Sequence, residues 1–275
     1  MPAPVLRITD PVDPRIAAFV SVKERDLAGR EGRFIAEGTV VLSLLAAQHA
    51  RGDGIVAEAV LLLENRLSGV MPLLDRFGPE VPVYVADRAV FNAIAGFDMH
   101  RGVMAIGRRG GLPSLETVLA RLPERALVLA AVGISNHDNM GSLFRNAAAF
   151  GAAAVLLDET CCDPFYRKAL RVSVGSVLTV PQVRGGSATG MLSALTAAGF
   201  SLFGLSPRGE LALQDLKPSA RTALVMGTEG EGLPPDLMAA LPTLRIRQKP
   251  GLDSLNVATA AGIALHHAAA LNGLI

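Results

Sequence analysis

The sequence predicts an α/β protein whose larger, C-terminal part is a parallel sheet with helices on both faces. Near-continuous apolar runs alternate there with helical patterns, which is typical of such sheets. The expected strands lie near 126–132, 153–158, 177–183, 200–205, 222–227 and 243–248. The expected helices lie near 139–150, 163–173, 188–198, 234–240 and 254–271. Because ligands of parallel sheets bind beyond the carboxyl ends of the strands, one site is expected from the loops 133–139, 206–210, 227–233 and 249–254.

The residues before this sheet predict a smaller α/β unit. An apolar helix follows Glu37–Gly38, and a second helix is expected near 88–95. Its strands are expected near 58–64, 81–86 and 102–106. The next segment carries Gly110–Gly111, Pro113 and Pro123 around a short amphipathic helix, which indicates a linker. We therefore expect two domains, 1–108 and 125–275, joined by a linker at 109–124.

Composition excludes several classes of protein. Half of the 275 residues are hydrophobic, yet we find no charge-free apolar run of about 18 residues, so no membrane span is expected. The start of the chain shows no secretory signal, and a cytoplasmic protein is expected. Cys161 and Cys162 are the only cysteines and make no disulfide framework. No Cys/His cluster has metal-ligand spacing, so no metal is expected.

The formal net charge of +1 gives no support for nucleic-acid binding, so any RNA contact must come from local basic clusters. A solvated face is the alternative interpretation of each cluster. The candidates are Lys23, Arg25, Arg30 and Arg33, then Arg101, Arg108 and Arg109, and finally Arg167, Lys168 and Arg171.

The stretch 135–151, SNHDNMGSLFRNAAAFG, is the most informative of the chain. It opens an apolar helix that Asn139, Asp138 or Ser135 could cap. Arg145 lies one helical turn beyond Gly141 and needs a carboxylate or phosphate partner if it is buried. A capped helix with one snorkelling arginine is the alternative.

Two later segments add further motifs. The first, TALVMGTEGEGLP at 222–234, is a β-type run followed by three glycines around Glu229. The second, LRIRQKPGLDSLNVATAAGIAL at 244–265, places Ser254, Leu255 and Asn256 at the start of a long helix. The free N–H groups at such a start favour an anion, although an ordinary N-cap would have the same sequence.

With these motifs in order, the chain resembles the SpoU/TrmH family of RNA ribose 2′-O-methyltransferases in the SPOUT superfamily. The motifs are N-x-G-x-x-x-R from Asn139 to Arg145, G-x-E-G-x-G from Gly227 to Gly232, and S-L-N-V from Ser254 to Val257. The resemblance implies a C-terminal trefoil knot, a homodimer and S-adenosyl-L-methionine as cofactor. RFIAEGTVVLSLL and HRGVMAIG are similar to parts of the ribosomal-protein-like RNA-binding domain that many members carry.

The resemblance also assigns site residues. The catalytic set is Arg145, Asn139, Glu229, Ser254 and Asn256. The cofactor-binding set is Leu205, Ser206, Gly227, Gly232, Ile246 and Leu255. For Arg145, stabilising the developing alkoxide or holding a phosphate is the safer physical role, because an arginine pKa above about 12 makes it a poor base.

The expected activity is S-adenosylmethionine-dependent methylation of a ribose 2′-hydroxyl in ribosomal or transfer RNA. No membrane and no DNA partner is expected. One alternative is a catalytically inactive RNA-binding scaffold of the same fold, against which Arg145, Glu229 and Asn256 argue. Another is a nucleotide-using α/β enzyme unrelated to RNA. The sequence has neither a dinucleotide fingerprint nor a Walker A motif, which disfavours that alternative.

Overall fold

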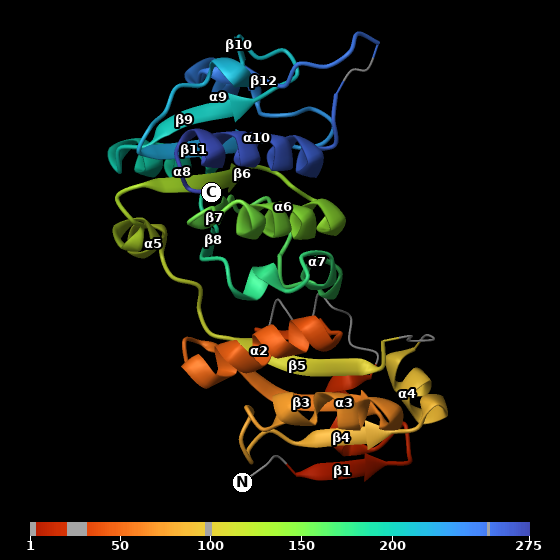
Figure 1. Ribbon diagram of the computed structural model, residues 1–275. Coiled ribbons are helices and arrows are strands. Elements are labelled where there is room, and N and C mark those ends of the chain that lie inside the picture. The colour runs from red at the N-terminus through yellow and green to blue at the C-terminus, as the bar shows by residue number, and fades with distance from the viewer. Residues whose placement is uncertain (1–3, 21–31, 97–100, 252–253) are drawn as a thin grey trace. The chain divides into compact units, whose positions relative to one another are not determined.

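The computed structural model describes residues 4–20, 32–96, 101–251 and 254–275, and it divides into two compact units (Figure 1). The first unit joins the described chain up to Gly111 with Phe165–Thr179. The second joins Leu112–Pro164 with Val180–Ile275. Within the described residues, no helix is long and apolar enough to cross a bilayer.

The second unit contains a parallel sheet, as the apolar runs predict. Its described strands follow the order β10-β12-β9-β11-β6-β7-β8, and every recorded pairing is parallel. All residues of the interior strand β6 are buried, which is what a sheet covered on both faces requires. The strands are β6 Ala126–Ala131, β7 Ala154–Leu157, β8 Gln182–Arg184, β9 Ser201–Leu205, β10 Leu211–Ala212, β11 Arg221–Met226 and β12 Thr243–Arg245.

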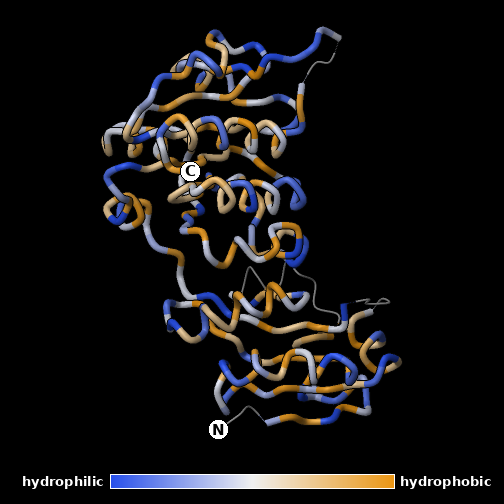
Figure 2. The backbone as a smooth tube through the Cα atoms, in the orientation of Figure 1, coloured by the Kyte–Doolittle hydropathy of each residue, from blue (hydrophilic) through white to orange (hydrophobic). Residues whose placement is uncertain are grey.

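Two groups of helices cover this sheet. Side chains of three helices share one core with Val128 and Ala130 of β6; these helices are α5 Leu115–Arg121, α8 Ala188–Ala197 and α9 Pro235–Ala240. Two others, α6 His137–Ala149 and α10 Val257–Leu271, pack against each other, and α10 also contacts β11 and β6. Figure 2 shows hydrophobic colours concentrated along the sheet strands. The sheet therefore presents its carboxyl edge between two helical layers.

The first unit is a smaller mixed sheet with the strand order β1-β4-β3-β5-β2. Strand β5 runs antiparallel to β2 and β3, while the other pairings are parallel. The strands are β1 Val5–Ile8, β2 Arg33–Glu37, β3 Ile55–Leu63, β4 Val83–Ala86 and β5 Val103–Arg109. The α-helices are α2 Thr39–Arg51, α3 Leu67–Leu74, α4 Arg88–Ala95 and α7 Arg167–Val172.

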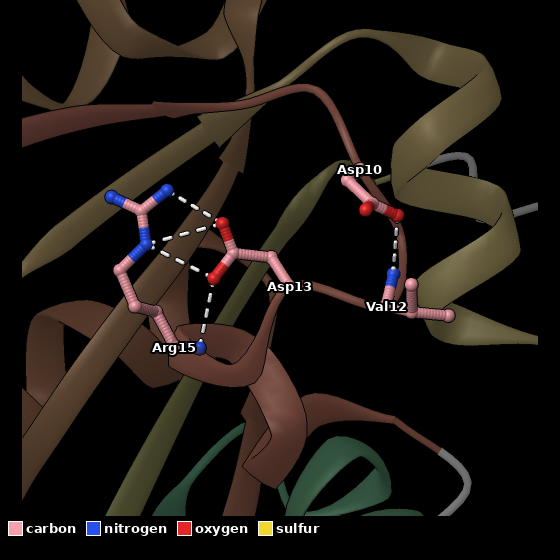
Figure 3. A network of polar contacts seen from close by, with 4 residues as sticks. All are labelled: Asp10, Val12, Asp13 and Arg15. Carbon is pink, nitrogen blue, oxygen red and sulfur yellow. Dashed lines mark hydrogen bonds and ion pairs between the residues drawn. The ribbon is translucent and has the colours of Figure 1, made fainter.

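Short 3-10 helices complete both units: η1 Pro14–Phe19, η3 Glu64–Arg66 and η4 Ser176–Leu178 in the first, and η5 Leu213–Asp215 in the second. A polar turn sets the start of η1 (Figure 3). Asp13 accepts hydrogen bonds from the Arg15 guanidinium and from the Arg15 backbone N–H, the latter at 2.9 Å, and these lower the pKa of the Asp13 carboxyl. Beside it, the Val12 N–H donates to Asp10 Oδ1 at 2.9 Å.

The expected strand at 177–183 is wrong over its first part. Gly175 takes a φ of 83° and Ser176–Leu178 form η4, so that only Gln182–Arg184 pair as β8. The apolar residues Val177 and Leu178 are buried in a 3-10 turn, which a run of hydrophobic letters cannot distinguish from a short strand. The sequence analysis also missed β1, β2, β10 and α3, of which α3 carries an internal proline, Pro72.

The two cysteines are expected to resist alkylation in the folded protein. Burial raises the pKa of the Cys161 thiol to about 12 and that of Cys162 to about 11, so both are protonated at neutral pH. Iodoacetamide at pH 8 should label them only after unfolding. The unfolded thiols ionise at lower pH than the folded ones, so the free energy of unfolding should fall as pH rises above 9. Fast labelling of native protein would contradict this environment.

Candidate active site

A cavity of about 370 Å³ lies at the carboxyl ends of β9, β11 and β12, wholly within the second unit. This is the edge at which parallel sheets bind ligands. Apolar side chains and glycine backbone make up much of its wall. The lining residues are Leu205, Ser206, Pro207, Arg208, Met226, Gly227, Thr228, Glu229, Gly230, Glu231, Gly232, Leu233, Met238, Leu244, Ile246, Gln248, Ser254, Leu255, Val257 and Ala260.

The turn after β11 closes on itself through its backbone. The Thr228 N–H donates to the Gly232 carbonyl at 3.0 Å, and the Gly232 N–H donates back to the Thr228 carbonyl at 3.2 Å. A Cβ at Gly227 would lie 2.1 Å from the carbonyl carbon of Gly232, and Gly232 itself has a φ of 77°. Both positions therefore require glycine, the first for close backbone approach and the second for a left-handed conformation.

The structure brings most of the predicted site residues to this cavity. All six predicted cofactor-binding residues line it, and so do Glu229 and Ser254 from the predicted catalytic set. The loop 133–139 contributes no lining residue, and it adjoins the site through the hydrogen bond of Asn139 to Glu229 and the close approach of Gly133 to the Thr228 side chain.

Three separate motifs meet in a chain of hydrogen bonds. The Asn139 amide on α6 donates to Glu229 Oε1 in the turn after β11. The Asn256 amide donates to Asn139 Oδ1 at 2.9 Å, and Asn256 Oδ1 accepts from the N–H groups of Ala258 and Thr259 at the start of α10. Asn256 is thus both an N-cap and a link to the site. Asn139 is only 9% exposed, so its partners are held in place.

The residue that caps α6 differs from the three candidates considered in the sequence. Asn136 is the N-cap, and its Oδ1 accepts from the N–H groups of Asp138 at 2.8 Å and Asn139 at 3.2 Å. This correction matters because it leaves the Asn139 side chain available for Glu229 and Asn256.

Arg145 lies outside the cavity, as Asn139 and Asn256 do, but among the described residues it lacks their hydrogen-bonded link to Glu229. Its side chain is exposed on α6 and does not line the cavity. No ion pair in the described part of the chain involves it. The cavity of one chain is therefore formed without this guanidinium.

Gln248 is a site residue that the sequence analysis missed. It lines the cavity, and its buried Oε1 has no hydrogen-bond partner among the described residues. It is the last residue of the strand expected at 243–248, directly before the predicted loop 249–254, and this position at a strand end was the available signal. An unpaired buried acceptor is costly, so a ligand donor at this point would stabilise the folded protein. The described residues include no group of three His, Cys, Asp or Glu side chains arranged for a metal ion.

A nucleotide-sized cavity at the carboxyl edge of a parallel sheet, closed by a glycine turn, defines an α/β enzyme that binds a small cofactor. Residues 126–266 match the SpoU rRNA Methylase family. An uncharacterized tRNA/rRNA methyltransferase of Mycobacterium bovis is 34% identical over 94% of this chain and 90% of its own length. The chain belongs to the SpoU family of methyltransferases.

Further relatives agree with this assignment. A 23S rRNA (guanosine-2′-O-)-methyltransferase of Burkholderia is 32% identical over 66% of this chain and 75% of its own length. The crystal structure of an RNA 2′-O ribose methyltransferase is 27% identical, covers 98% of this chain and all of its own, and superposes with a TM-score of 0.75. An AdoMet-bound rRNA methyltransferase of Sinorhizobium meliloti, 24% identical, has the same fold with a TM-score of 0.78 over 96% of this chain and 97% of its own.

Proposed function

We propose that this chain transfers a methyl group from S-adenosylmethionine to a ribose 2′-hydroxyl of structured ribosomal or transfer RNA. The hydrogen-bonded convergence of Asn139, Glu229 and Asn256 beside a glycine-lined cavity carries the proposal. The printed activities of the Burkholderia and RNA 2′-O ribose relatives support the same reaction. Nucleoside mass spectrometry of RNA from a deletion strain should show one missing 2′-O-methyl nucleotide, and unchanged RNA would reject the proposal.

The cavity fits S-adenosylmethionine in size and chemistry. Its volume lies within the range of small-molecule sites. Leu205, Ile246 and Leu255 offer apolar surface to a purine ring, and the glycine backbone allows close approach. The unpaired Oε1 of Gln248 offers an acceptor to an amino group. When bound, the cofactor supplies an electrophilic methyl group on a sulfonium.

The chain's own residues orient the attacking hydroxyl. Glu229 lines the cavity, and the linked side chains of Asn139 and Asn256 behind it hold its carboxylate in place, so that it needs no rearrangement when the ribose arrives. Ser254 also lines the cavity. Arg145 stabilises the alkoxide that forms as the hydroxyl loses its proton, or holds an adjacent phosphate.

Because Arg145 does not line the cavity of its own chain, we propose that it acts in a homodimer on the cavity of a second copy. The exposed Ile263 on α10, the helix packed against α6, supports an interface at this face. Light scattering at micromolar concentration should give the mass of a dimer, and a monomer would contradict this arrangement.

Arg145→Ala and Arg145→Lys should each lower the rate of methyl transfer by about 100-fold or more, because both substitutions remove the planar guanidinium group. The melting temperature should not change, because the side chain is exposed. Arg121→Ala, an exposed arginine on α5, is the matched control and should retain activity. If Arg145→Lys retained full activity, the proposed role would be wrong.

The finer architecture is also part of the proposal. We assign residues 1–108 to an RNA substrate-binding domain, 109–124 to a linker and 125–275 to the methyltransferase domain with a trefoil knot; within this last range, Phe165–Thr179 pack with the first unit. Strand β12 lies beyond β9 in the sheet, whereas the helix that follows it, α10, packs against α6, β6 and β11. This packing supports a chain that crosses back over the sheet after β12, as a knot would require.

Calorimetry separates an enzyme from a scaffold, since RNA binding without heat from S-adenosylmethionine would favour a scaffold.

A further inference from the structure

A second cavity, of about 360 Å³, lies wholly within the first unit at the start of α2. Three arginines from separate elements line it: Arg66 ends η3, Arg101 lies just before β5, and Arg171 belongs to α7. All three side chains are exposed to solvent. These groups are far apart in the sequence, and only the fold assembles them.

Several basic residues of the clusters expected from the sequence contact groups outside this cavity. Arg33 and Arg108 share the carboxylate of Glu58, each with a distance of 2.6 Å from its Nε to a Glu58 oxygen. The guanidinium of Arg109 lies 4.5 Å from the ring centroid of Phe165. Lys23, Arg25 and Arg30 lie outside the described residues. The basic clusters expected from the sequence are therefore redistributed, and Arg101 and Arg171 come together with Arg66.

The cavity carries net positive charge. Among the described residues that line it, Glu37 is the one carboxylate, and its Oε2 lies 3.8 Å from Nη1 of Arg167. The lining side chains thus include three arginines and one carboxylate, and that carboxylate also pairs with Arg167. The first turn of α2 has no acidic residue and no side-chain cap, so its N–H groups add to the positive potential.

The backbone around the cavity is fitted to these side chains. At Gly38, the N-cap of α2, a Cβ would lie 3.2 Å from Nη1 and 3.3 Å from Cδ of Arg101, so glycine lets this arginine lie over the helix start. Val174, which also lines the cavity, has a φ of 54° and is the one non-glycine with positive φ among the described residues. Such a conformation costs about 1–3 kcal/mol and persists where its surroundings fix it.

We propose that this cavity binds a backbone phosphate of the RNA substrate through Arg66, Arg101 and Arg171. The inference rests on the proposed function, because it takes the ligand to be that RNA. Three guanidinium groups suit phosphate oxygens, which they bind in bidentate fashion. A small-molecule anion would be largely enclosed by its site, whereas these arginines are exposed and suit a phosphate that stays part of a polymer. The exposed Val40 beside them offers apolar surface to an adjoining sugar or base.

The test compares two triple variants of the full-length protein that lose the same charge. The first replaces Arg66, Arg101 and Arg171 with alanine. The control replaces Arg51, Arg76 and Arg88, exposed arginines elsewhere in the first unit. Filter binding to a 23S ribosomal RNA transcript and to bulk transfer RNA is measured over a range of salt concentrations. The cavity variant should bind at least tenfold more weakly at low salt, and its slope of log affinity against log salt should be shallower by about 1–2. The control should stay within about twofold of wild type.

Equal losses in both triple variants, or no loss in the cavity variant, would overturn the phosphate site. A single Arg101→Lys variant, which keeps the positive charge but loses the planar guanidinium, should bind RNA with an affinity between those of wild type and the cavity variant. Calorimetry with S-adenosylmethionine should give wild-type affinity for the cavity variant, because the two cavities belong to different units. If wild type methylates RNA but the cavity variant binds RNA normally, this inference fails and the proposed function stands. If wild type neither binds these RNAs nor methylates them, both fail.

Discussion

Replacing Gly227 with alanine is expected to weaken cofactor binding by about 30-fold. The added Cβ would lie 2.1 Å from the carbonyl carbon of Gly232 and 2.2 Å from the Leu233 nitrogen, and these backbone atoms cannot rotate away as a side chain could. The turn at 227–232 must therefore shift away from the end of β11, which changes the shape of the cavity that this turn lines. A penalty of about 2 kcal/mol corresponds to about 30-fold weaker binding, and calorimetry with S-adenosylmethionine would measure it.

Gly69→Ala is the matched control for this substitution. Gly69 lies in α3, and a Cβ there would meet no heavy atom within 4 Å. Alanine should stabilise this helix by up to about 1 kcal/mol and leave cofactor affinity unchanged. Circular dichroism should show both variants folded at the temperature of the titration. Wild-type affinity in a folded Gly227→Ala variant would show that the close approach of Gly227 to Gly232 is not needed for the cavity.

Replacing Asn139 with alanine should have the second largest effect. It leaves the Glu229 carboxylate without its donor and the Asn256 amide without its acceptor. Each unpaired group costs about 1–3 kcal/mol, and the Glu229 carboxylate, which lines the cavity, would lose the contact that fixes its position. Methyl transfer should fall by about 100-fold or more, measured as turnover at saturating S-adenosylmethionine and RNA.

Asn146→Ala provides the control on the same helix. Its amide donates to the Ala258 carbonyl at 2.7 Å, so this variant also breaks one hydrogen bond between α6 and the start of α10. It should lower the free energy of unfolding by about 1 kcal/mol while turnover stays near wild type. Equal loss of turnover in both variants would mean that helix packing, rather than the Asn139 side chain, limits the reaction.

The sequence predicted the cavity better than it predicted the polar contacts around it. Strands β6, β9 and β11 are long enough and apolar enough to be recognised, and their order along the chain locates the motif loops. In the structure Gly227 admits the backbone of Gly232, and Gly232 takes a positive φ, so the turn requires glycine at both motif positions. Local spacing could not reveal that Asn136 rather than Asn139 caps α6, because several neighbouring polar residues could serve as the cap.

Contacts over long sequence separations could not be predicted. Asn139 and Glu229 are 90 residues apart in the sequence, and neither motif alone predicts that its side chain binds the other. The grouping of Phe165–Thr179 with the first unit depends in the same way on tertiary packing, such as that of Phe165 against Phe34 with ring centroids 5.2 Å apart. Likewise, the ion pairs of Arg33 and Arg108 with Glu58 depend on the pairing of β2 and β3 with β5.

The most direct test of the proposed reaction is transfer of a labelled methyl group from S-adenosylmethionine to RNA, followed by alkaline hydrolysis. Alkali cleaves RNA through the free 2′-hydroxyl, so a methylated ribose protects the bond that follows it. We expect the label in alkali-stable dinucleotides with wild-type protein and little or none with Asn139→Ala. Label recovered in mononucleotides would indicate methylation of a base, and this result, or the absence of transfer to both ribosomal and transfer RNA, would contradict the proposed function.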